Sequence, residues 1–421
     1  MLHAFAIAST PVPLIIDTDL GFDVDDVGAI AVANHLQDLG ECRLLAVIHD
    51  TGFKKGVGGV DVIRSYYNRS FALGAYKGEW ASSDFAQAAQ DKYTTMLLDK
   101  YPSAVKNYDE VPTALHAYRT VLADAEDASV VIASIGEPTN LRDLLSADRD
   151  LVRRKVKRIV FMDGAYNFGC AEAHGTPTSP WLGSTVGCEK AAEYVEEHLP
   201  RTTIRQVFTL NGGNILTAGR FNAGCGQGPV KAAYQRWTNY GTRPSWDPIA
   251  VVLAVRGSTS LWSSELEGTD EVNAAGDEVF NTSLTGTNES QVWIDAARRG
   301  DVVRVLDDML CAAPCRGKDP KEVGACAGYS LHSGANCYGD RDGHGRHGAD
   351  DLENPPSASC GVMTLEACMR RCDATHGCDA VTVAPADDQL LGLINCYRKA
   401  NVSIRGCDAG AWRFETWVKR A

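Results

Sequence analysis

Residues 14–26 read Leu-Ile-Ile-Asp-Thr-Asp-Leu-Gly-Phe-Asp-Val-Asp-Asp, and five of these thirteen positions are aspartates. The apolar run from Pro13 to Ile16 predicts a buried strand, and Gly21 permits a sharp turn beyond it. Carboxylates this close repel one another unless protons or a cation neutralise them, and oxygen ligands favour Ca²⁺ or Mg²⁺. The stretch therefore predicts a metal site where a strand ends. Its aspartates are Asp17, Asp19, Asp23, Asp25 and Asp26.

Simpler or different roles for this stretch fit less well. An acidic turn that caps the following helix would explain one or two aspartates, but not five at this spacing. An EF-hand loop starting at Asp17 needs Gly at its sixth position and Glu at its twelfth, where this chain has Phe22 and Gly28. A haloacid-dehalogenase-type phosphatase shares the Asp-x-Asp pattern but continues with Gly-Thr, whereas Leu20-Gly21 follows here.

Short apolar runs alternate with helical patterns over residues 1–310. This alternation predicts an α/β fold with a mainly parallel open sheet and helices on both of its faces. The expected strands are 14–16, 44–48, 130–134, 158–162 and 203–208. The expected helices are 24–36, 57–67, 113–123, 139–146, 190–198, 230–240, 248–256 and 301–310.

Length and charge exclude several classes of protein. A chain of 421 residues exceeds what one core normally serves, so two domains are expected. A net charge of −13 without basic runs argues against a nucleic acid polymer or anionic lipid as a partner. Apolar runs such as 249–255 are far shorter than the roughly 18 residues that suggest a membrane span.

Three further turns carry polar groups at the ends of expected strands or the start of a helix. Ser245-Trp246-Asp247-Pro248 leads into an apolar helix, with Pro suited to its first helical position and Asp to the cap before it. Ile135-Gly136 follows the strand 130–134 and opens a helix. The stretch 161–168 follows another strand and contains Asn167. Taken singly, each is an ordinary connection.

Taken in order, these segments resemble the nucleoside hydrolase family from about residue 12 to 310. Residues 17–26 are similar to the longer variant of the family's opening, Asp-Thr-Asp-x-Gly-x-Asp-Asp. Residues 243–248 resemble the Arg-Pro-Ser-Trp-Asp-Pro of one family branch. Residues 134–141 are similar to its Gly-Pro-Leu-Thr-Asn turn, and 161–168 to its Met-Gly-Gly turn with the ribose-binding residues that follow.

The resemblance implies calcium-dependent hydrolysis of the N-glycosidic bond of ribonucleosides, giving ribose and free base. Asp19 is the implied general base, because it would hold a water molecule beside the cation and remove its proton. Asp17 and Asp23 are expected to support the loop. The implied calcium ligands are the side chains of Asp19, Asp26 and Asp247 and the carbonyl oxygen of Ile135.

The resemblance also implies which residues contact the substrate. Asp25 and Asn167 would bind ribose hydroxyls. Ala165 stands where the family has a ribose-binding Glu, and the nearby Glu172 is the expected substitute. Many relatives have His directly before the metal-binding Asp. Trp246 stands there in this chain, and an indole can stack on the base but cannot donate a proton at neutral pH.

Ten of the fourteen cysteines lie in the last 111 residues. That density is typical of a small disulfide-stapled module in an oxidising compartment, and predicts a secreted protein whose signal peptide is incomplete or missing in this chain. A zinc-binding tail is the alternative, but the Cys368-x₃-Cys372-x₅-Cys378 spacing matches paired Cys-x₂-Cys knuckles poorly.

The tail resembles a PAN/apple module, a small disulfide-rich α+β domain. The resemblance rests on 364–383, which match its central helix and strand, and on 395–397, Cys407 and 414–417, which match its later strands. It implies helix-to-sheet disulfides, Cys372–Cys378 and Cys368–Cys396, and a protein or carbohydrate ligand. The expected domains are 1–310, hydrolase-like, and 336–421, PAN/apple-like, joined by a linker at 311–335.

Two functions from different classes remain open. The first is an active secreted nucleoside hydrolase, with a ribonucleoside as its small-molecule substrate; homo-oligomers are compatible with it. The second is a secreted binding or adhesion protein whose hydrolase domain has decayed and whose tail module does the work. Retention of Asp19, Asp25, Asp26 and Asp247 favours the first, whereas Ala165 and Trp246 favour the second.

Overall fold

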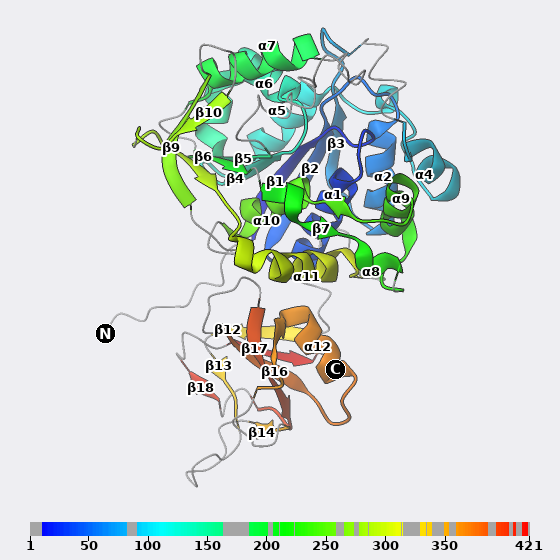
Figure 1. The fold of residues 1–421 in the computed structure, drawn as a ribbon, viewed down its shortest axis with the longest axis vertical. Helices are drawn as coiled ribbons and strands as arrows, with labels where there is room; N and C mark the ends of the chain where they lie inside the picture. The colour runs from blue at the N-terminus through cyan, green and yellow to red at the C-terminus, as the bar shows by residue number, and fades with distance from the viewer. Residues whose placement is uncertain are drawn as a thin grey trace. The chain divides into compact units, whose positions relative to one another are not determined.

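The computed structural model of the chain divides into two compact units (Figure 1). The larger contains Pro11–Ser258 and Ser263–Val323, and the smaller contains the chain from Gly324 onward. The predicted linker bounds, 311 and 335, stay a prediction. The structure describes residues 11–81, 91–162, 185–200, 205–209, 211–222, 224–257, 265–272, 278–284, 286–312, 314, 329–333, 335–338, 349–352, 359–385, 393–403, 407–409 and 415–419.

A nine-stranded sheet forms the centre of the larger unit, in the order β10-β9-β11-β6-β5-β4-β1-β2-β3. The strands from β3 to β11 run parallel, and β9 and β10 add an antiparallel edge. The strands are β1 Val12–Thr18, β2 Cys42–His49, β3 Ala72–Ala75, β4 Val130–Ser134, β5 Val156–Phe161, β6 Arg205–Thr209, β9 Glu265–Val272, β10 Glu278–Asn281 and β11 Glu289–Val292.

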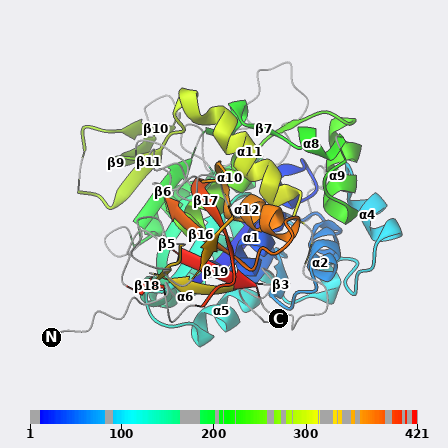
Figure 2. The ribbon, with the colours of Figure 1, turned by 90° about the horizontal axis from the view of Figure 1, so that it is seen from below.

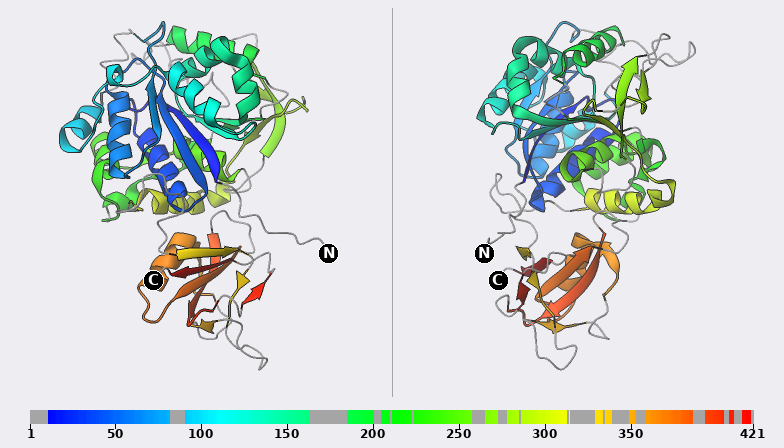
Figure 3. Two further views of the ribbon diagram at one scale, coloured as in Figure 1. Left: turned by 180° about the vertical axis from the view of Figure 1, so that it is seen from behind. Right: turned by 90° about the vertical axis from the view of Figure 1, so that its left-hand side faces the viewer.

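Helices cover both faces of this sheet, which confirms the predicted fold class (Figure 3). One face carries α5 Ala114–Asp124 and α6 Thr139–Lys155, with α7 Thr185–His198 packed on α6. The other carries α1 Asp25–Asp38 and α10 Trp246–Arg256, which pack on each other. The remaining helices are α2 Gly56–Tyr66, α4 Thr94–Lys100, α8 Gly219–Asn222, α9 Gly228–Thr238 and α11 Arg299–Leu310.

Apolar periodicity explains why the elements form where the sequence places them. On the α5–α6 face, Ile15 of β1 and Ile48 of β2 pack with Leu141 and Leu144 of α6 in one buried core. Alternate strand residues and helix residues three apart supply these contacts, as the two periods require. The five expected strands and eight expected helices correspond to elements that the structure contains.

The strand order places a break in chain direction between β1 and β4. From β1 the chain continues to β2 and β3 on one side, then returns to β4 and continues to β5 and β6 on the other. Asp17 pairs with Ile48 of β2 and with Ser134 of β4. Open α/β sheets bind ligands outside the carboxyl ends of strands at such a point, and the aspartate-rich loop starts there.

The smaller unit is an antiparallel sheet with one packed helix (Figure 2). Its helix α12, Leu365–Asp373, contacts β15, β16 and β17. The predicted bridges Cys368–Cys396 and Cys372–Cys378 are both present and lie in its buried core. The strands are β12 Tyr329–Ser333, β13 Ala335–Asn336, β14 Asp350–Asp351, β15 Val362–Thr364, β16 Ala380–Pro385, β17 Leu393–Ala400, β18 Asp408–Ala409 and β19 Glu415–Lys419.

Two more disulfides refine the cysteine interpretation. Cys337 pairs with Cys407 within the smaller unit. Cys311, which the sequence grouped with the cysteine-rich tail, pairs instead with Cys225 of the larger unit. Cys42 is a buried thiol. No helix among the described residues is long and apolar enough to cross a membrane.

We expect reduction to unfold the smaller unit before the larger one. Its core includes cystine sulfur atoms, and each bridge typically stabilises such a domain by about 2–4 kcal/mol. Limited proteolysis before and after reductant, read by mass spectrometry, should show cleavage within 329–419 first. The Cys368→Ala/Cys396→Ala variant should show the same cleavage without reductant. Equal resistance of both units when reduced would contradict this expectation.

Candidate metal centre

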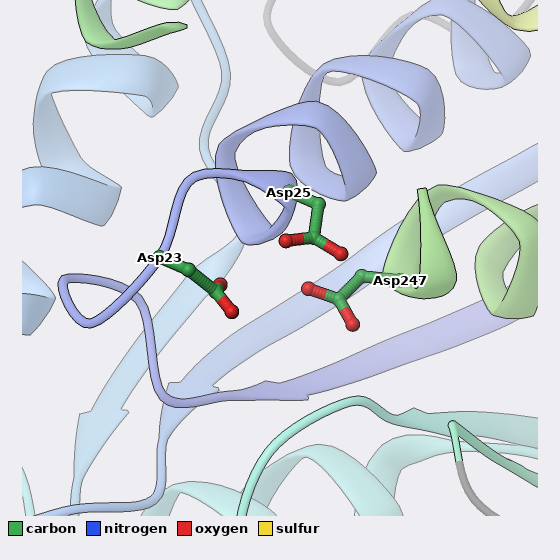
Figure 4. A group of neighbouring side chains, drawn as sticks. All are labelled: Asp23, Asp25 and Asp247. Carbon is green, nitrogen blue, oxygen red and sulfur yellow. The ribbon is translucent and has the colours of Figure 1, made fainter. Parts of the chain in front are cut away.

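Three carboxylates converge beside the carboxyl end of β1. Asp23 lies in the loop after β1, Asp25 begins α1 and Asp247 lies in the first turn of α10 (Figure 4). Each offers an oxygen within 4.8 Å of the others, and Asp25 and Asp247 are buried. This geometry is compatible with a metal ion, because hard cations prefer oxygen ligands.

Close packing of helices brings Asp247 to this position. A Cβ on Gly28 of α1 would lie 3.2 Å from Cγ of Pro248 and 2.1 Å from the hydroxyl of Tyr234, so glycine allows α10 and α9 to approach. Helix α10 begins at Trp246, with Ser245 at its cap. The sequence had placed Asp at the cap itself. Asp247 instead stands in the first turn, where the helix dipole favours a negative charge.

Arg243 supplies a fixed positive charge to two of the three carboxylates. Its Nε donates a hydrogen bond of 2.8 Å to Oδ1 of Asp25, and its guanidinium also pairs with Asp23. The Arg243 side chain is 10% exposed and lies 4.5 Å from the ring centre of Trp237 and 4.8 Å from that of Trp246. Burial opposes its charge, but Asp23 and Asp25 outweigh burial and raise the pKa of Arg243.

The second oxygen of Asp25 is also engaged, because it accepts a hydrogen bond of 3.2 Å from the backbone nitrogen of Trp246. Burial, followed by the charge of Asp23, raises the pKa of Asp25 to about 7, against the opposing effect of Arg243. The aspartate is therefore held in place by the start of α10 and by Arg243. The sequence placed Asp25 against ribose; the structure adds these two neighbours.

We expect Arg243→Met to destabilise the larger unit strongly. The methionine keeps an apolar stem but leaves two largely buried carboxylates without their counter-charge, which typically costs about 3–5 kcal/mol. Chemical denaturation would measure the loss. Arg153→Met is the matched control, because the Arg153–Asp150 pair is 53% and 82% exposed and should contribute less than about 1 kcal/mol. Similar losses in both variants would contradict the buried-pair interpretation.

Asp26 lies next to this group and is fully buried. One of its oxygens accepts a hydrogen bond from the Thr18 hydroxyl, and the other has no hydrogen-bond partner in the described chain. Burial raises the pKa of Asp26, and the charges of Asp19, Asp247 and Asp23 raise it further. A buried carboxylate that faces other carboxylates is neutralised by protons or by a cation. The acidic group is therefore consistent with a metal site whose donors are all oxygen atoms.

Ile135 occupies the turn that follows β4, beside the aspartate-rich loop. Its backbone nitrogen donates to the carbonyl of Asp17 at 2.8 Å. A Cβ on the adjacent Gly136 would lie 2.6 Å from the backbone nitrogen of Asp19, so only glycine permits this approach. The implied ligand set nevertheless stays a prediction, because Asp19 and Asp26 lie outside the group of oxygens that converges within 4.8 Å.

The remaining expected site residues have different outcomes. Trp246 is half-buried beside Arg243, so its predicted stacking on a base stays a prediction. Asn167 and Glu172 lie outside the described residues. The sequence assigned Asp23 only a supporting role and gave Arg243 none. The signal was present in the Arg-Pro-Ser-Trp-Asp-Pro stretch, but its partner carboxylate lies 218 residues away in the chain.

Comparison with known proteins shows the fold. No protein-family model and no curated protein matches the chain. A plant nucleoside hydrolase, PpNRh1, has a similar structure at 18% identity, with a TM-score of 0.53 over 72% of this chain and 99% of that one. An inosine-uridine preferring nucleoside hydrolase from Bacillus anthracis is 13% identical, with a TM-score of 0.51 over 70% of this chain and 99% of that one. The type III effector XopQ, solved with adenosine diphosphate ribose, is 16% identical, with a TM-score of 0.52 over 73% of this chain and 95% of that one. The larger unit thus has the nucleoside hydrolase fold.

Proposed function

We propose that this protein hydrolyses the N-glycosidic bond of ribonucleosides in a calcium-dependent reaction. The observation that carries the proposal is the convergence of Asp23, Asp25 and Asp247 beside the buried Asp26, at the point where a nucleoside-hydrolase fold reverses its strand order. Fold alone does not decide an activity. The acidic centre adds the chemistry that such a reaction needs.

Calcium would be held by the side chains of Asp19, Asp26 and Asp247 and by the carbonyl oxygen of Ile135. The unpartnered oxygen of Asp26 supports this set, because a buried carboxylate oxygen needs a donor or a cation. Arg243 supports it indirectly, because its guanidinium already balances Asp23 and Asp25 and leaves Asp26 and Asp247 to the metal. Calcium, when bound, would lower the pKa of a water molecule at this site.

Side chains of the protein would accept the proton and orient the sugar. Asp19, half-buried at the end of β1, would accept a proton from the attacking water. Asp25, Asn167 and Glu172 would orient the ribose, with Asp25 held in place by Arg243 and by the Trp246 backbone. Trp246 would stack on the base. Apolar and aromatic groups around the site would exclude bulk water.

A reducing-sugar assay tests the activity most directly. Inosine, adenosine and uridine would each be incubated with the full chain, with calcium and with EGTA. Release of ribose that requires calcium supports the proposal. The Asp247→Asn variant should release none above background, because Asp247 belongs to the convergent group. No ribose release from any of these nucleosides would contradict the proposed reaction.

In a second candidate function, the larger unit keeps the hydrolase fold but no longer catalyses hydrolysis. Both oxygens of Asp25 are engaged within the protein, which is the observation that favours a decayed hydrolase. The chain would then act as a secreted binding or adhesion protein through its disulfide-stapled smaller unit, a PAN/apple-like module with a protein or carbohydrate ligand. Isothermal titration with a non-hydrolysable nucleoside analogue separates the two, because a decayed site would bind none. The disulfides among the described residues favour an oxidising compartment in either case.

A further inference from the structure

A second pair of buried carboxylates, Asp17 and Asp50, lies on the opposite face of the sheet from α1 and α10. Ile15 of β1 and Ile48 of β2 belong to the core under α5 and α6. Because side chains alternate along a strand, Asp17 and Asp50, two positions further on, face the same side. Both aspartates are 0% exposed. This pair therefore lies on a different face from the Asp25, Asp26 and Asp247 group, although the charge of Asp26 still acts on Asp50.

The backbone packs closely around Asp50. Its backbone nitrogen donates to the carbonyl of Thr18 at 2.9 Å, and its carbonyl accepts a hydrogen bond from the Thr139 hydroxyl of α6. A Cβ on Gly136 would lie 2.4 Å from Oδ2 and 2.8 Å from Oδ1 of Asp50. The turn between β4 and α6 thus closes over this carboxylate, which only a glycine at position 136 permits.

The acceptor oxygens around Asp17 and Asp50 outnumber the donors available to them. Asn140 uses its Nδ2 to donate to Oδ1 of Asp17 at 2.6 Å and to the carbonyl of His49 at 3.2 Å. Within the described chain, both carboxylate oxygens of Asp50 and Oδ1 of Asn140 have no hydrogen-bond partner. The Tyr118 hydroxyl lies beside Asp17 and interacts with its carboxylate, so Asp17 has a donor that Asp50 lacks.

The negative charges around Asp50 also lack a balancing positive charge among the groups that act most strongly on it. The charged groups that act most strongly on Asp50 are all acidic, namely Asp17, Asp19, Glu137 and Asp26. Burial and these charges raise the pKa of Asp50 well above its usual range. Asp25, by contrast, has Arg243 as its counter-charge. Two ionised carboxylates that leave water without a cation are strongly unfavourable.

We propose that Asp17, Asp50 and the carbonyl oxygen of Asn140 bind a second divalent cation of the calcium class, on the α5–α6 face of the sheet. Four acceptor oxygens from three side chains would surround it, and its charge would balance the two carboxylates. A single shared proton would satisfy one acceptor and leave the others unpaired. The ion would join the carboxyl ends of β1 and β2 to α6, a structural role that does not depend on the proposed hydrolysis.

Calcium stoichiometry tests this site. The full chain would be treated with EDTA, refilled with calcium alone, desalted and measured by elemental analysis. We expect about two equivalents in the wild type, one in Asp50→Asn and one in Asp247→Asn. Asparagine keeps the shape of the side chain but removes its charge. Circular dichroism of Asp50→Asn checks that the lost equivalent does not reflect unfolding, and Asn140→Leu, which removes a neutral ligand, should also lose one.

Each site can fail separately in this experiment. Two equivalents retained by folded Asp50→Asn would overturn the second site. The second site would also be overturned if the wild type bound one equivalent of calcium, Asp247→Asn bound none and Asp50→Asn still bound one. Protons would then neutralise Asp17 and Asp50. The opposite result is one equivalent of calcium in the wild type, none in Asp50→Asn and one in Asp247→Asn. It would support the second site and contradict the calcium centre of the proposed hydrolase.

Discussion

Asp19→Asn should abolish nucleoside hydrolysis while leaving the fold intact. The amide keeps the shape of the side chain and can still offer one oxygen to a cation, but it cannot take a proton from water. General-base catalysis contributes about 10²–10⁴-fold to a rate, so kcat should fall by roughly that factor. Asp19 is half-buried and directly follows β1.

Steady-state kinetics with the best nucleoside substrate would measure this loss. Calcium content by elemental analysis, measured on the same samples, separates a lost base from a lost cation. Asp150→Asn is the matched control, because it makes the same change at a side chain that is 82% exposed in α6. Turnover within a few-fold of wild type in Asp19→Asn would rule this residue out as the base.

The sequence predicted the elements whose physical signal is local. The apolar run before Asp17 and the helical period after Asp25 correspond to β1 and α1. The bridges of Cys368 and Cys372, which the resemblance of the tail to a PAN/apple module implied, are both present. Strand β9, near the antiparallel edge of the sheet, was missed because it lacks such a signal. Strand β9 carries Glu265, Glu267, Asp270 and Glu271 and contains no apolar run.

The missed parts of the site depend on contacts between distant segments. The Arg243–Asp25 pair joins residues 218 positions apart, and the sequence near either residue does not indicate its partner. Asp50 follows a strand as many loop aspartates do. Its significance needs the parallel register of β1 and β2, which places it beside Asp17 on the α5–α6 face. Strand order and register decide these neighbours, and a single sequence does not encode them locally.

Calcium removal should destabilise the larger unit, and more so at pH 7.5 than at pH 5. Burial raises the pKa of Asp17 and of Asp25 to about 7, and raises that of Asp26 and Asp247 as well. Without calcium, the folded form therefore holds protons between about pH 4 and 7 that the unfolded form releases. The free energy of unfolding then falls as pH rises through this window, by up to ~1.4 kcal/mol per pH unit for each such carboxyl group. Calcium would replace those protons.

Thermal denaturation in EGTA and in excess calcium, from pH 5 to 7.5, measures this linkage. The melting temperature in EGTA should fall across the range, whereas in calcium it should change little, so the difference between the two curves should widen toward pH 7.5. Folded protein should also release protons when calcium binds at pH 6, which calorimetry in buffers of different ionisation enthalpy detects. The Asp26→Asn/Asp50→Asn variant should narrow the gap, because two of the buried acids no longer titrate. A melting temperature in EGTA that rises with pH would mean that these carboxylates are ionised in the folded protein without a cation, and the metal interpretation of both acidic groups would fail.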